Sequence, residues 1–431
     1  MKEYSVYKES QIPWIGKIPT HWNIEPFGRH FSYAKGLPIT KANLTNEGIA
    51  VISYGQIHSK LNTGTKISKE LIRYVSPTYI ESNPQSILKI NDFIFADTSE
   101  DLNGSGNCAF NDFNNYIFAG YHTLIARPIR LDNPKYYAYL FQSQNWKNQI
   151  RSLVNGVKVY SINRAILKKT TLLFPSLSEQ QHIVSFLDDK TAKIDEYIDK
   201  KNKEIENLKE WKKALIAHVV TKGLNTNAKM KDSGVSWIGE IPEHWKVDKL
   251  GMHFRQRNEK VSDKEFPALS VSKEGVTPQL STAVKTDNGD NRKKVCKGDF
   301  VVNSRSDRKG SCGFSSYDGS VSLINIVVTP IELCDRYYHY LFRSNNYIEE
   351  FYRLGRGIVA DLWTTRYVEM RNIMIPLPPI EEQQEIVEYI DAATTKADKM
   401  IVELTNHVES MKEYKQRLIA DVVTGKINVQ P

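Results

Sequence analysis

The stretch SLSEQQHIVSFLDDKTAKIDEYIDKKNKEIENLKEWKKALIAHVVTKGL, residues 176–224, is matched without a gap by PIEEQQEIVEYIDAATTKADKMIVELTNHVESMKEYKQRLIADVVTGKI, residues 379–427. Both copies lack Pro and Gly from their second residue until near their ends, where Gly223 and Gly425 are typical helix stops. Ser178, followed by Glu and Gln, predicts a capping-box start for the first helix, and two prolines precede the second. The chain therefore contains a duplication that predicts two long helices.

Each predicted helix carries one narrow apolar stripe, in which apolar residues recur in alternating steps of four and three. The simplest arrangement pairs the two helices as an antiparallel coiled coil, because a long chain segment between them allows the return. A helix of this length extends about 70 Å. Two helices that each pack on their own globular domain remain an alternative. The predicted seam residues are Ile194, Ile198, Ile205, Leu208, Leu215, Val219, Ile401, Leu404, Val408, Met411, Leu418 and Val422.

The duplication extends into the segments that precede each helix. WIGKIPTHW (14–22) returns as WIGEIPEHW (237–245), and YYAYLF (136–141) returns as YYHYLF (337–342). Alternating apolar residues elsewhere in both halves indicate strands. We therefore predict an α+β fold in which two mixed α/β domains are separated by two long antiparallel coiled-coil helices, with an internal pseudo-twofold duplication. The predicted segments are a first domain at 1–176, a central helix at 177–230, a second domain at 231–378 and a C-terminal helix at 379–431.

The overall composition is that of a globular chain that does not enter a membrane. No apolar run approaches the roughly 20 residues of a membrane helix, and the first residues lack the apolar core of a signal peptide, so we expect a cytoplasmic protein. The four cysteines form no CxxC pair and have no His at ligand spacing. We therefore expect buried free thiols and no metal site.

The net charge of +8 is unevenly distributed. Residues 179–224 and 382–427 of the two long helices carry 15 basic and 18 acidic residues, a net charge of −3, so the rest of the chain carries +11. A basic excess in the globular domains is expected if those domains meet the phosphates of a nucleic acid. For each residue alone, a solvated surface position is the simpler interpretation. The candidate DNA contacts are Tyr54, Gln56, Lys158, Tyr160, Arg164, Arg292, Lys293, Arg305, Arg308, Lys309 and Arg356.

Arginine is suited to the bidentate recognition of guanine in the major groove, which makes Arg305 and Arg308 candidates for base contacts. No catalytic constellation accompanies these residues. The chain has no GxxxxGK[ST] motif and no methyltransferase Asn/Asp-Pro-Pro-Tyr/Phe motif, and the ExK pattern at Glu210 lies on a predicted helix without an acidic strand partner. His21 and His244 belong to the duplicated Trp-rich phrase, for which we predict a structural role in docking each domain onto a helix.

The duplicated WIGxIPxHW phrase, the SLSEQQHIV and PIEEQQEIV helix starts and the ALIAHVVTKGL and RLIADVVTGKI helix ends resemble the specificity (S) subunits of type I restriction-modification enzymes. The resemblance spans nearly the whole chain. It implies that residues 1 to about 176 and about 231 to 378 are target-recognition domains, each reading half of a split DNA sequence. The two helices would set the spacing between the half-sites, which we expect to lie one to two helical turns apart.

The resemblance also implies partners. The chain itself would be non-catalytic and would need no cofactor. It would bind double-stranded DNA, two methyltransferase subunits that use S-adenosylmethionine to methylate adenine, and up to two restriction subunits that use ATP and Mg²⁺. The alternatives are the recognition subunit of a two-headed system with a fused methyltransferase-nuclease, an autonomous DNA-modifying enzyme, and a coiled-coil scaffold without a role on nucleic acid.

Overall fold

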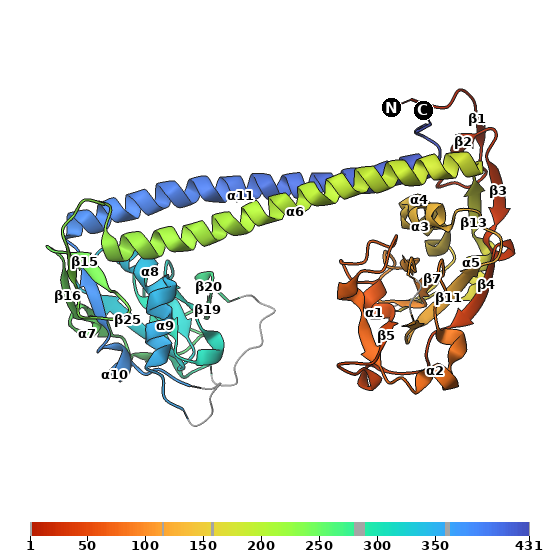
Figure 1. Ribbon diagram of the computed structural model, residues 1–431. Helices are drawn as coiled ribbons and strands as arrows, with labels where there is room; N and C mark the ends of the chain where they lie inside the picture. Colours follow the sequence, from red (N-terminus) through yellow and green to blue (C-terminus); the bar gives the residue numbers. More distant parts are fainter. Residues whose placement is uncertain (1, 114–115, 157–158, 280–288, 358–362, 431) are drawn as a thin grey trace. The chain divides into compact units, whose positions relative to one another are not determined.

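The computed structural model describes residues 2–113, 116–156, 159–279, 289–357 and 363–430 (Figure 1). The chain forms two compact units. Unit 1 comprises Met1–Lys200 and Asn406–Pro431, and unit 2 comprises Lys201–Thr405. The long helices α6 (Leu177–Lys222) and α11 (Ile380–Val423) each contribute to both units. The unit boundaries therefore cut through both helices, whereas the predicted segments follow the order of the chain.

Each unit contains one globular domain of short strands and helices. In unit 1 these are β1 (Tyr7–Glu9), β2 (Lys17–Pro19), β3 (Asn23–Pro26), β4 (Phe31–Lys35), β5 (Ile49–Ile52), α1 (Tyr54–Ile57), β6 (Arg73–Val75), α2 (Tyr79–Ser82), β7 (Phe93–Ala96), β8 (Thr98–Ser99), β9 (Cys108–Phe110), β10 (Ile117–Ala119), β11 (Thr123–Pro128), α3 (Pro134–Gln142), α4 (Gln144–Arg151), β12 (Tyr160–Ser161), α5 (Arg164–Lys169) and β13 (Thr171–Phe174). In unit 2 they are β14 (Met230–Asp232), β15 (Glu240–Pro242), β16 (Lys246–Lys249), α7 (Leu250–His253), β17 (Phe254–Gln256), β18 (Lys260–Val261), β19 (Leu269–Ser272), β20 (Gly275–Pro278), β21 (Arg292–Val295), β22 (Phe300–Asn303), β23 (Cys312–Phe314), β24 (Gly319–Val321), β25 (Asn325–Pro330), α8 (Asp335–Arg343), α9 (Asn345–Arg353), α10 (Tyr367–Met370) and β26 (Met374–Leu377).

Each domain has its own antiparallel four-stranded sheet, and the two sheets have equivalent strand orders. The order is β4-β11-β7-β9 in unit 1 and β17-β25-β22-β23 in unit 2. Strands β7 and β22 are buried along their whole length, as short uninterrupted apolar runs predict. The smaller three-stranded sheets differ, because β10 pairs parallel to β5 in unit 1 whereas β21 and its neighbours are antiparallel in unit 2. The duplication therefore preserves the central sheet and changes the sheet beside it.

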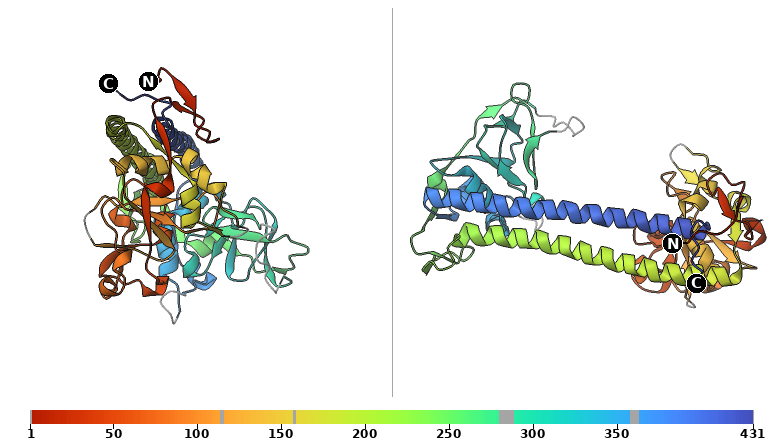
Figure 2. Two further views of the ribbon diagram at one scale, coloured as in Figure 1. Left: turned by 90° about the vertical axis from the view of Figure 1, so that its right-hand side faces the viewer. Right: turned by 90° about the horizontal axis from the view of Figure 1, so that it is seen from above.

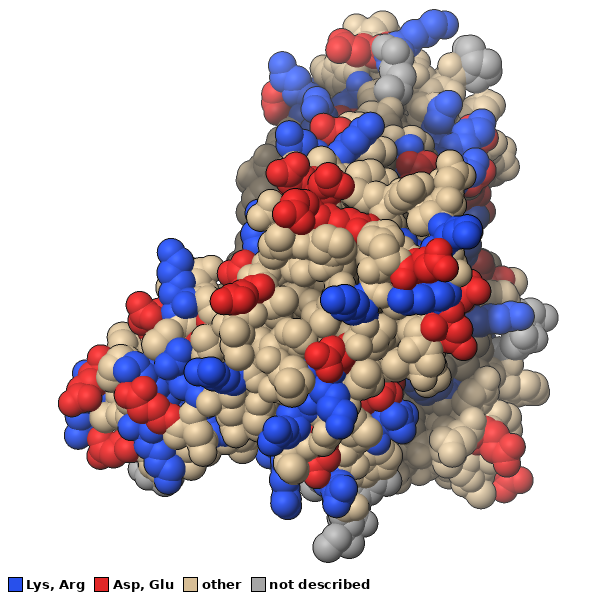
Figure 3. Space-filling model, turned by 90° about the vertical axis from the view of Figure 1, so that its left-hand side faces the viewer, with Lys and Arg blue, Asp and Glu red and all other residues tan. Residues whose placement is uncertain are grey.

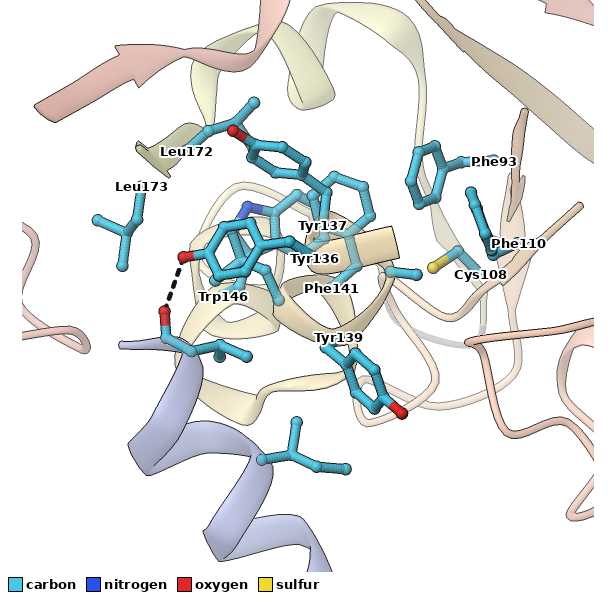
Figure 4. Close-up of a cluster of buried hydrophobic side chains, with 14 of the residues drawn as sticks. Phe93, Cys108, Phe110, Tyr136, Tyr137, Tyr139, Phe141, Trp146, Leu172 and Leu173 are labelled. Atoms are coloured by element: carbon cyan, nitrogen blue, oxygen red, sulfur yellow. Dashed lines mark hydrogen bonds between the residues drawn. The ribbon is translucent and has the colours of Figure 1, made fainter. Parts of the chain in front are cut away.

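A helical pair packs on the central sheet of each unit. Ser143 ends α3 and caps α4 by accepting a hydrogen bond from the backbone of Trp146, and Ser344 does the same for α9. In unit 1 the rings of Phe141 and Trp146 lie 4.3 Å apart in a buried aromatic cluster (Figure 4). Aromatic side chains of this size supply much of the apolar area that each domain buries.

The duplicated tyrosine phrases anchor the ends of the long helices. The buried Tyr136 hydroxyl donates to the carbonyl of Val423 at 3.0 Å, a bond marked in Figure 4. The buried Tyr337 hydroxyl donates to the carbonyl of Val220 at 2.6 Å in unit 2. Each bond satisfies a carbonyl in the last turn of a helix, where no intrahelical donor is available.

Within each unit, α6 and α11 run antiparallel and side by side (Figures 1 and 2). All twelve predicted seam residues are buried or half-buried. Lys415 pairs with Asp195 at 2.6 Å in unit 1, and Lys212 pairs with Asp398 in unit 2. The predicted fold class is confirmed: two mixed α/β domains, two antiparallel long helices and an internal duplication. Among the described residues, no helix is long and apolar enough to cross a membrane.

Candidate nucleic-acid interface

Two loops of unit 2 join into one surface, which we call the unit 2 platform. The first loop, residues 304–311, follows β22 and contains a short 3₁₀ turn at Ser306–Arg308. The second, residues 363–366, leads into α10. Ser306 donates its backbone N–H to the carbonyl of Trp363 at 3.0 Å, and Thr365 donates to the carbonyl of Ser304 at 3.0 Å. The backbone therefore fixes two loops that lie more than 50 residues apart in the sequence.

Four of the candidate DNA contacts gather on or beside this platform. Arg305, Arg308 and Lys309 lie on the first loop, and Arg356 is bridged to the second through Thr364. The side chains of Arg305 and Arg308 are 42% and 69% exposed. Figure 3, which looks onto unit 2, shows Lys and Arg side chains gathered over the lower part of this face. The structure thus brings together cations that the sequence shows only as separate clusters.

Two other candidates of unit 2 have side chains that are engaged within the fold. Arg292 is buried on β21, where its Nε donates to the Ser320 hydroxyl at 2.9 Å, and Lys293 donates from Nζ to the carbonyl of Asn325 at 2.7 Å. Burial lowers the pKa of both side chains. DNA contacts through these two residues stay predictions, although Arg292 is only 5% exposed and both side chains are already hydrogen-bonded within the fold. The charge-rich run NRKKV is a strand that turns Arg292 inward, and not an exposed loop.

Unit 1 builds the equivalent surface, the unit 1 platform, from the loop at residues 97–107 and the segment at 160–163. Strand β8 pairs with β12, and Ile162 donates its N–H to the carbonyl of Asp97 at 2.8 Å, as Thr365 does to Ser304 in unit 2. Tyr160 lies in β12, and Arg164 begins α5, for which Asn163 is the N-cap. Lys158 falls outside the described residues.

The remaining candidates, Tyr54 and Gln56, lie on α1 beside the unit 1 platform. The amide oxygen of Gln56 accepts from the backbone of Ser53 at 3.1 Å and so helps to cap α1, which occupies part of its hydrogen-bonding capacity. Tyr54 is half-buried, with its ring 5.4 Å from that of His122. The structure therefore leaves Tyr54 at the edge of the platform and gives Gln56 a local structural role.

Sequence reasoning missed His122, which contacts the unit 1 platform at Asp97. Its φ of 54° is uncommon for a residue other than Gly, and its ring lies 3.4 Å from Asp97. Its carbonyl accepts from the N–H of Asp97, as the carbonyl of Ile324 accepts from Ser304 in unit 2. A non-Gly residue in this conformation often marks a functional site. No sequence motif surrounds His122, so only the fold could identify it.

The duplicated Trp-rich phrase lies at the start of the long helices and makes what we call the clasp. In unit 1, Oε1 of Glu179 accepts from Trp22 Nε1 at 3.1 Å and lies 2.9 Å from His21 Nε2. In unit 2, Glu382 makes the same contacts with Trp245 and His244, at 2.9 and 2.8 Å. The two histidines therefore have the structural role that the sequence predicted.

The cap at the start of α6 differs from the prediction. Oε2 of Glu179 accepts from the backbone N–H and the hydroxyl of Ser176, and the Ser176 hydroxyl accepts from the backbone of Glu179. The capping box is therefore made by Ser176 and not by Ser178.

The four cysteines are free thiols, and burial raises the pKa of Cys108 and of Cys312 to about 12.

A comparison with known families decides the identity. The model described as the type I restriction modification DNA specificity domain matches twice, at residues 31–207 and 242–410. The chain belongs to this family. The two matches fall on the two halves of the internal duplication and together cover most of the chain. The prediction that the chain is a DNA-specificity component, and a non-catalytic one, is therefore confirmed.

Individual relatives agree with this assignment over the full length. A Methanocaldococcus jannaschii protein named as the MjaX type I restriction enzyme specificity subunit is 26% identical over 458 aligned residues, which cover 98% of both chains. The specificity subunit of the type I restriction enzyme EcoKI from Escherichia coli K12 is 21% identical and covers 96% of this chain and 91% of its own.

Solved structures share the fold. A chain from a study of complex assembly and conformational transition of the type I R-M system superposes with a TM-score of 0.68 at 17% identity, and 95% of this chain and 99% of that chain are covered. The HsdS subunit from Thermoanaerobacter tengcongensis gives a TM-score of 0.52 at 16% identity, with 95% and 98% covered.

Proposed function

We propose that this specificity subunit reads a split DNA target, with one half-site read by the platform of each unit, and directs adenine methylation and restriction to that target. One observation carries the proposal. The same pair of loops is joined by the same backbone hydrogen bonds in both units, yet the side chains that the loops present differ. A duplicated frame with divergent side chains is suited to reading two different short sequences.

The long helices support the finer proposal of two identical partner subunits. Large apolar side chains are exposed at repeat-equivalent positions, Trp211 on α6 and Tyr414 on α11, which are 46% and 45% exposed. Leu177 and Ile380 form a second equivalent pair of exposed residues. Exposed aromatic residues are frequent anchors of protein interfaces. Two equivalent surfaces would each accept one methyltransferase subunit.

The remaining parts of the proposal concern the partners' chemistry. Methylation would draw on S-adenosylmethionine, and restriction on ATP and Mg²⁺, all bound by the partner subunits, with up to two restriction subunits per complex. The complex would act in the cytoplasm, where chromosomal DNA is accessible. The half-sites are expected to lie one to two helical turns apart.

Methylation mapping tests the proposal. Genomic DNA is compared between cells that make this chain with its methyltransferase partner and cells that make the methyltransferase alone. A split motif with methyladenine in both halves, present only with this chain, is expected. A contiguous motif, or no new motif in cells where both proteins are made, would contradict the proposal. Copurification then counts the methyltransferase and restriction subunits, and a single fused partner would point to a two-headed system.

A further inference from the structure

The unit 2 platform holds two exposed arginines on one short turn. Arg305 is the N-cap of the 3₁₀ turn, and the backbone N–H of Arg308 donates to the carbonyl of Arg305 at 3.1 Å. Arg305 itself is extended, and the two ends of such a hydrogen-bonded turn lie within about 7 Å of each other, measured between their Cα atoms. Base pairs stack about 3.4 Å apart, so two such side chains can reach bases within about two pairs of each other.

A single carboxylate lies between the two arginines. Oδ1 of Asp307 lies 3.1 Å from Nε of Arg305, and Oδ2 lies 4.0 Å from Nε of Arg308. In both pairs the closest approach is through Nε, at the side of the guanidinium. Among the described residues, the terminal Nη groups of these arginines make no hydrogen bond. Each guanidinium therefore keeps the two donors that fit O6 and N7 of guanine.

Beside Arg308 lies a depression of about 540 Å³, which Asp307 and Arg308 line together with Arg292, Asn303 and Ser311. Asn303 and Ser311 are buried polar residues, whereas Arg308 stands at the exposed rim. A base edge that enters this depression would meet buried polar groups and the exposed guanidinium of Arg308. The depression adjoins Arg308 and Asp307, and Arg305 lies outside it on the same turn.

The unit 1 platform lacks these groups. Strand pairing places Thr98 at the position of Arg305, because Thr98 pairs with Ser161 as Arg305 pairs with Thr364. Three residues after Thr98 stands Asp101, whose carboxylate accepts from the backbone of Gly104 and so closes the turn. Neither Thr98 nor Asp101 can offer the paired donors of a guanidinium.

We infer that the unit 2 platform reads two guanines within about two base pairs of each other, one through Arg305 and one through Arg308, with Asp307 as the positioning residue that orients both. The half-site of unit 1 is read without such a pair. This inference rests on the proposed function, because it assumes that each platform meets one half-site.

The test uses the complex of the full chain with its methyltransferase partner and duplexes of the mapped target, in which each guanine is replaced singly by 7-deazaguanine. This analogue keeps base pairing and loses N7. In the wild-type complex, two nearby replacements in one half-site should each weaken binding, by less than the roughly 5- to 150-fold expected for a whole bidentate contact, because O6 remains as an acceptor. Arg305→Lys and Arg308→Lys keep the charge and lose the fork. Each should weaken binding to the unmodified target and reduce the effect of one of the two replacements, because a flexible ammonium takes the place of the rigid fork.

Asp307→Asn separates positioning from a purely structural role. Discrimination against both 7-deazaguanine probes should fall several-fold, while binding to a non-target duplex stays equal or rises because a negative charge is removed. Equal weakening on target and non-target DNA would overturn the role of Asp307. Arg353→Lys, an exposed arginine on α9 paired with Glu350, is the matched control and should change none of these values. The melting temperature of each variant checks its folding.

The two hypotheses fail in different ways. If no split motif is found, the proposed function fails. If a split motif is found but neither lysine variant changes the response to any 7-deazaguanine, the motif stands and the guanine-reading inference is overturned. Changes that fall on both half-sites alike would overturn it as well, because the half-site of unit 1 serves as the internal control.

Discussion

Replacing Glu179 with Ala should release the start of the chain from α6 while leaving the equivalent clasp of unit 2 in place. The Glu179 side chain is 2% exposed and serves two structures at once. Oε1 holds His21 and the buried Trp22, and Oε2 completes the capping box with Ser176. No other carboxylate among the described contacts takes over either role.

The expected cost follows from what is left unpaired. The exposed His21 can bond to water, but the Nε1–H of the fully buried Trp22 cannot, and an unsatisfied buried donor costs about 1–3 kcal/mol. Loss of the cap adds about 1 kcal/mol. Local opening of residues 13–22 should therefore become easier by about 2–4 kcal/mol. Glu382→Ala should cost less, about 1–2 kcal/mol, because Glu382 is 20% exposed and follows Pro379, which has no N–H to cap.

Hydrogen exchange followed by mass spectrometry measures the two clasps separately in the full chain. Peptides that cover residues 13–22 should exchange about 30- to 700-fold faster in Glu179→Ala, since each 1.4 kcal/mol is a factor of ten. Peptides that cover residues 236–245 should keep their wild-type rate. Glu381→Gln, which removes a charge from an exposed neighbour of Glu382, is the control. Unchanged exchange at residues 13–22, or an equal rise in both peptides, would refute the assignment of the clasp.

The pH dependence gives an independent check. Burial would raise the pKa of Glu179, but hydrogen bonds from His21, Trp22 and Ser176 outweigh it, and the pKa lies below its ordinary value of 4.5. The carboxylate therefore stabilises the folded state fully above about pH 4.5, and this contribution is lost as the pH falls through the folded-state pKa. The difference in exchange between the wild type and Glu179→Gln should shrink in that acidic range.

Three further predictions concern the helices and the DNA. Lys415→Leu removes a half-buried charge from the seam and frees Asp195 to bind water, so the melting temperature should rise or stay equal. A clear fall in the melting temperature would contradict the view that the Lys415–Asp195 pair only sets the register of the two helices. Trp211→Ala and Tyr414→Ala should each lower the affinity of one methyltransferase site by about tenfold or more, as expected for a hot-spot anchor, and the double variant should lower the affinity of both sites. Native mass spectrometry counts the methyltransferase subunits that remain bound. DNA affinity should fall steeply with salt concentration. Arg356→Ala should reduce by about one the slope of the logarithm of the binding constant against the logarithm of the salt concentration, and an unchanged slope would show that Arg356 does not contact a phosphate.

The sequence predicted the elements whose pattern is long and local. The 3.5-residue period over more than 40 positions fixed both helices, and exact repetition of short phrases fixed the duplication. The sequence could not predict which way the side chains of a short strand point. Arg292 looks like a loop cation in NRKKV, and only the partner Ser320, 28 residues further on, shows that it points inward. His122 was missed because its partner Asp97 comes from a separate segment. Asp307 stands between Arg305 and Arg308 in the sequence, but only the folded turn shows that its carboxylate approaches both.

The charged seam residues lower the stability of the coiled coil locally, but they also specify the register in which the two helices pair. Lysine at a seam position costs stability compared with an apolar residue, yet Lys212 and Lys415 occupy equivalent places in the two helices. Each meets an aspartate at an equivalent place, Asp398 or Asp195. A slip of one helix by a heptad, about 10 Å, would break both pairs and leave four charges without partners. Because each unit holds one pair, register is specified twice along the same seam. If the subunit holds two half-sites at one spacing, as proposed, it requires such a constraint, and an all-apolar stripe, which can repack after a slip, would not supply it.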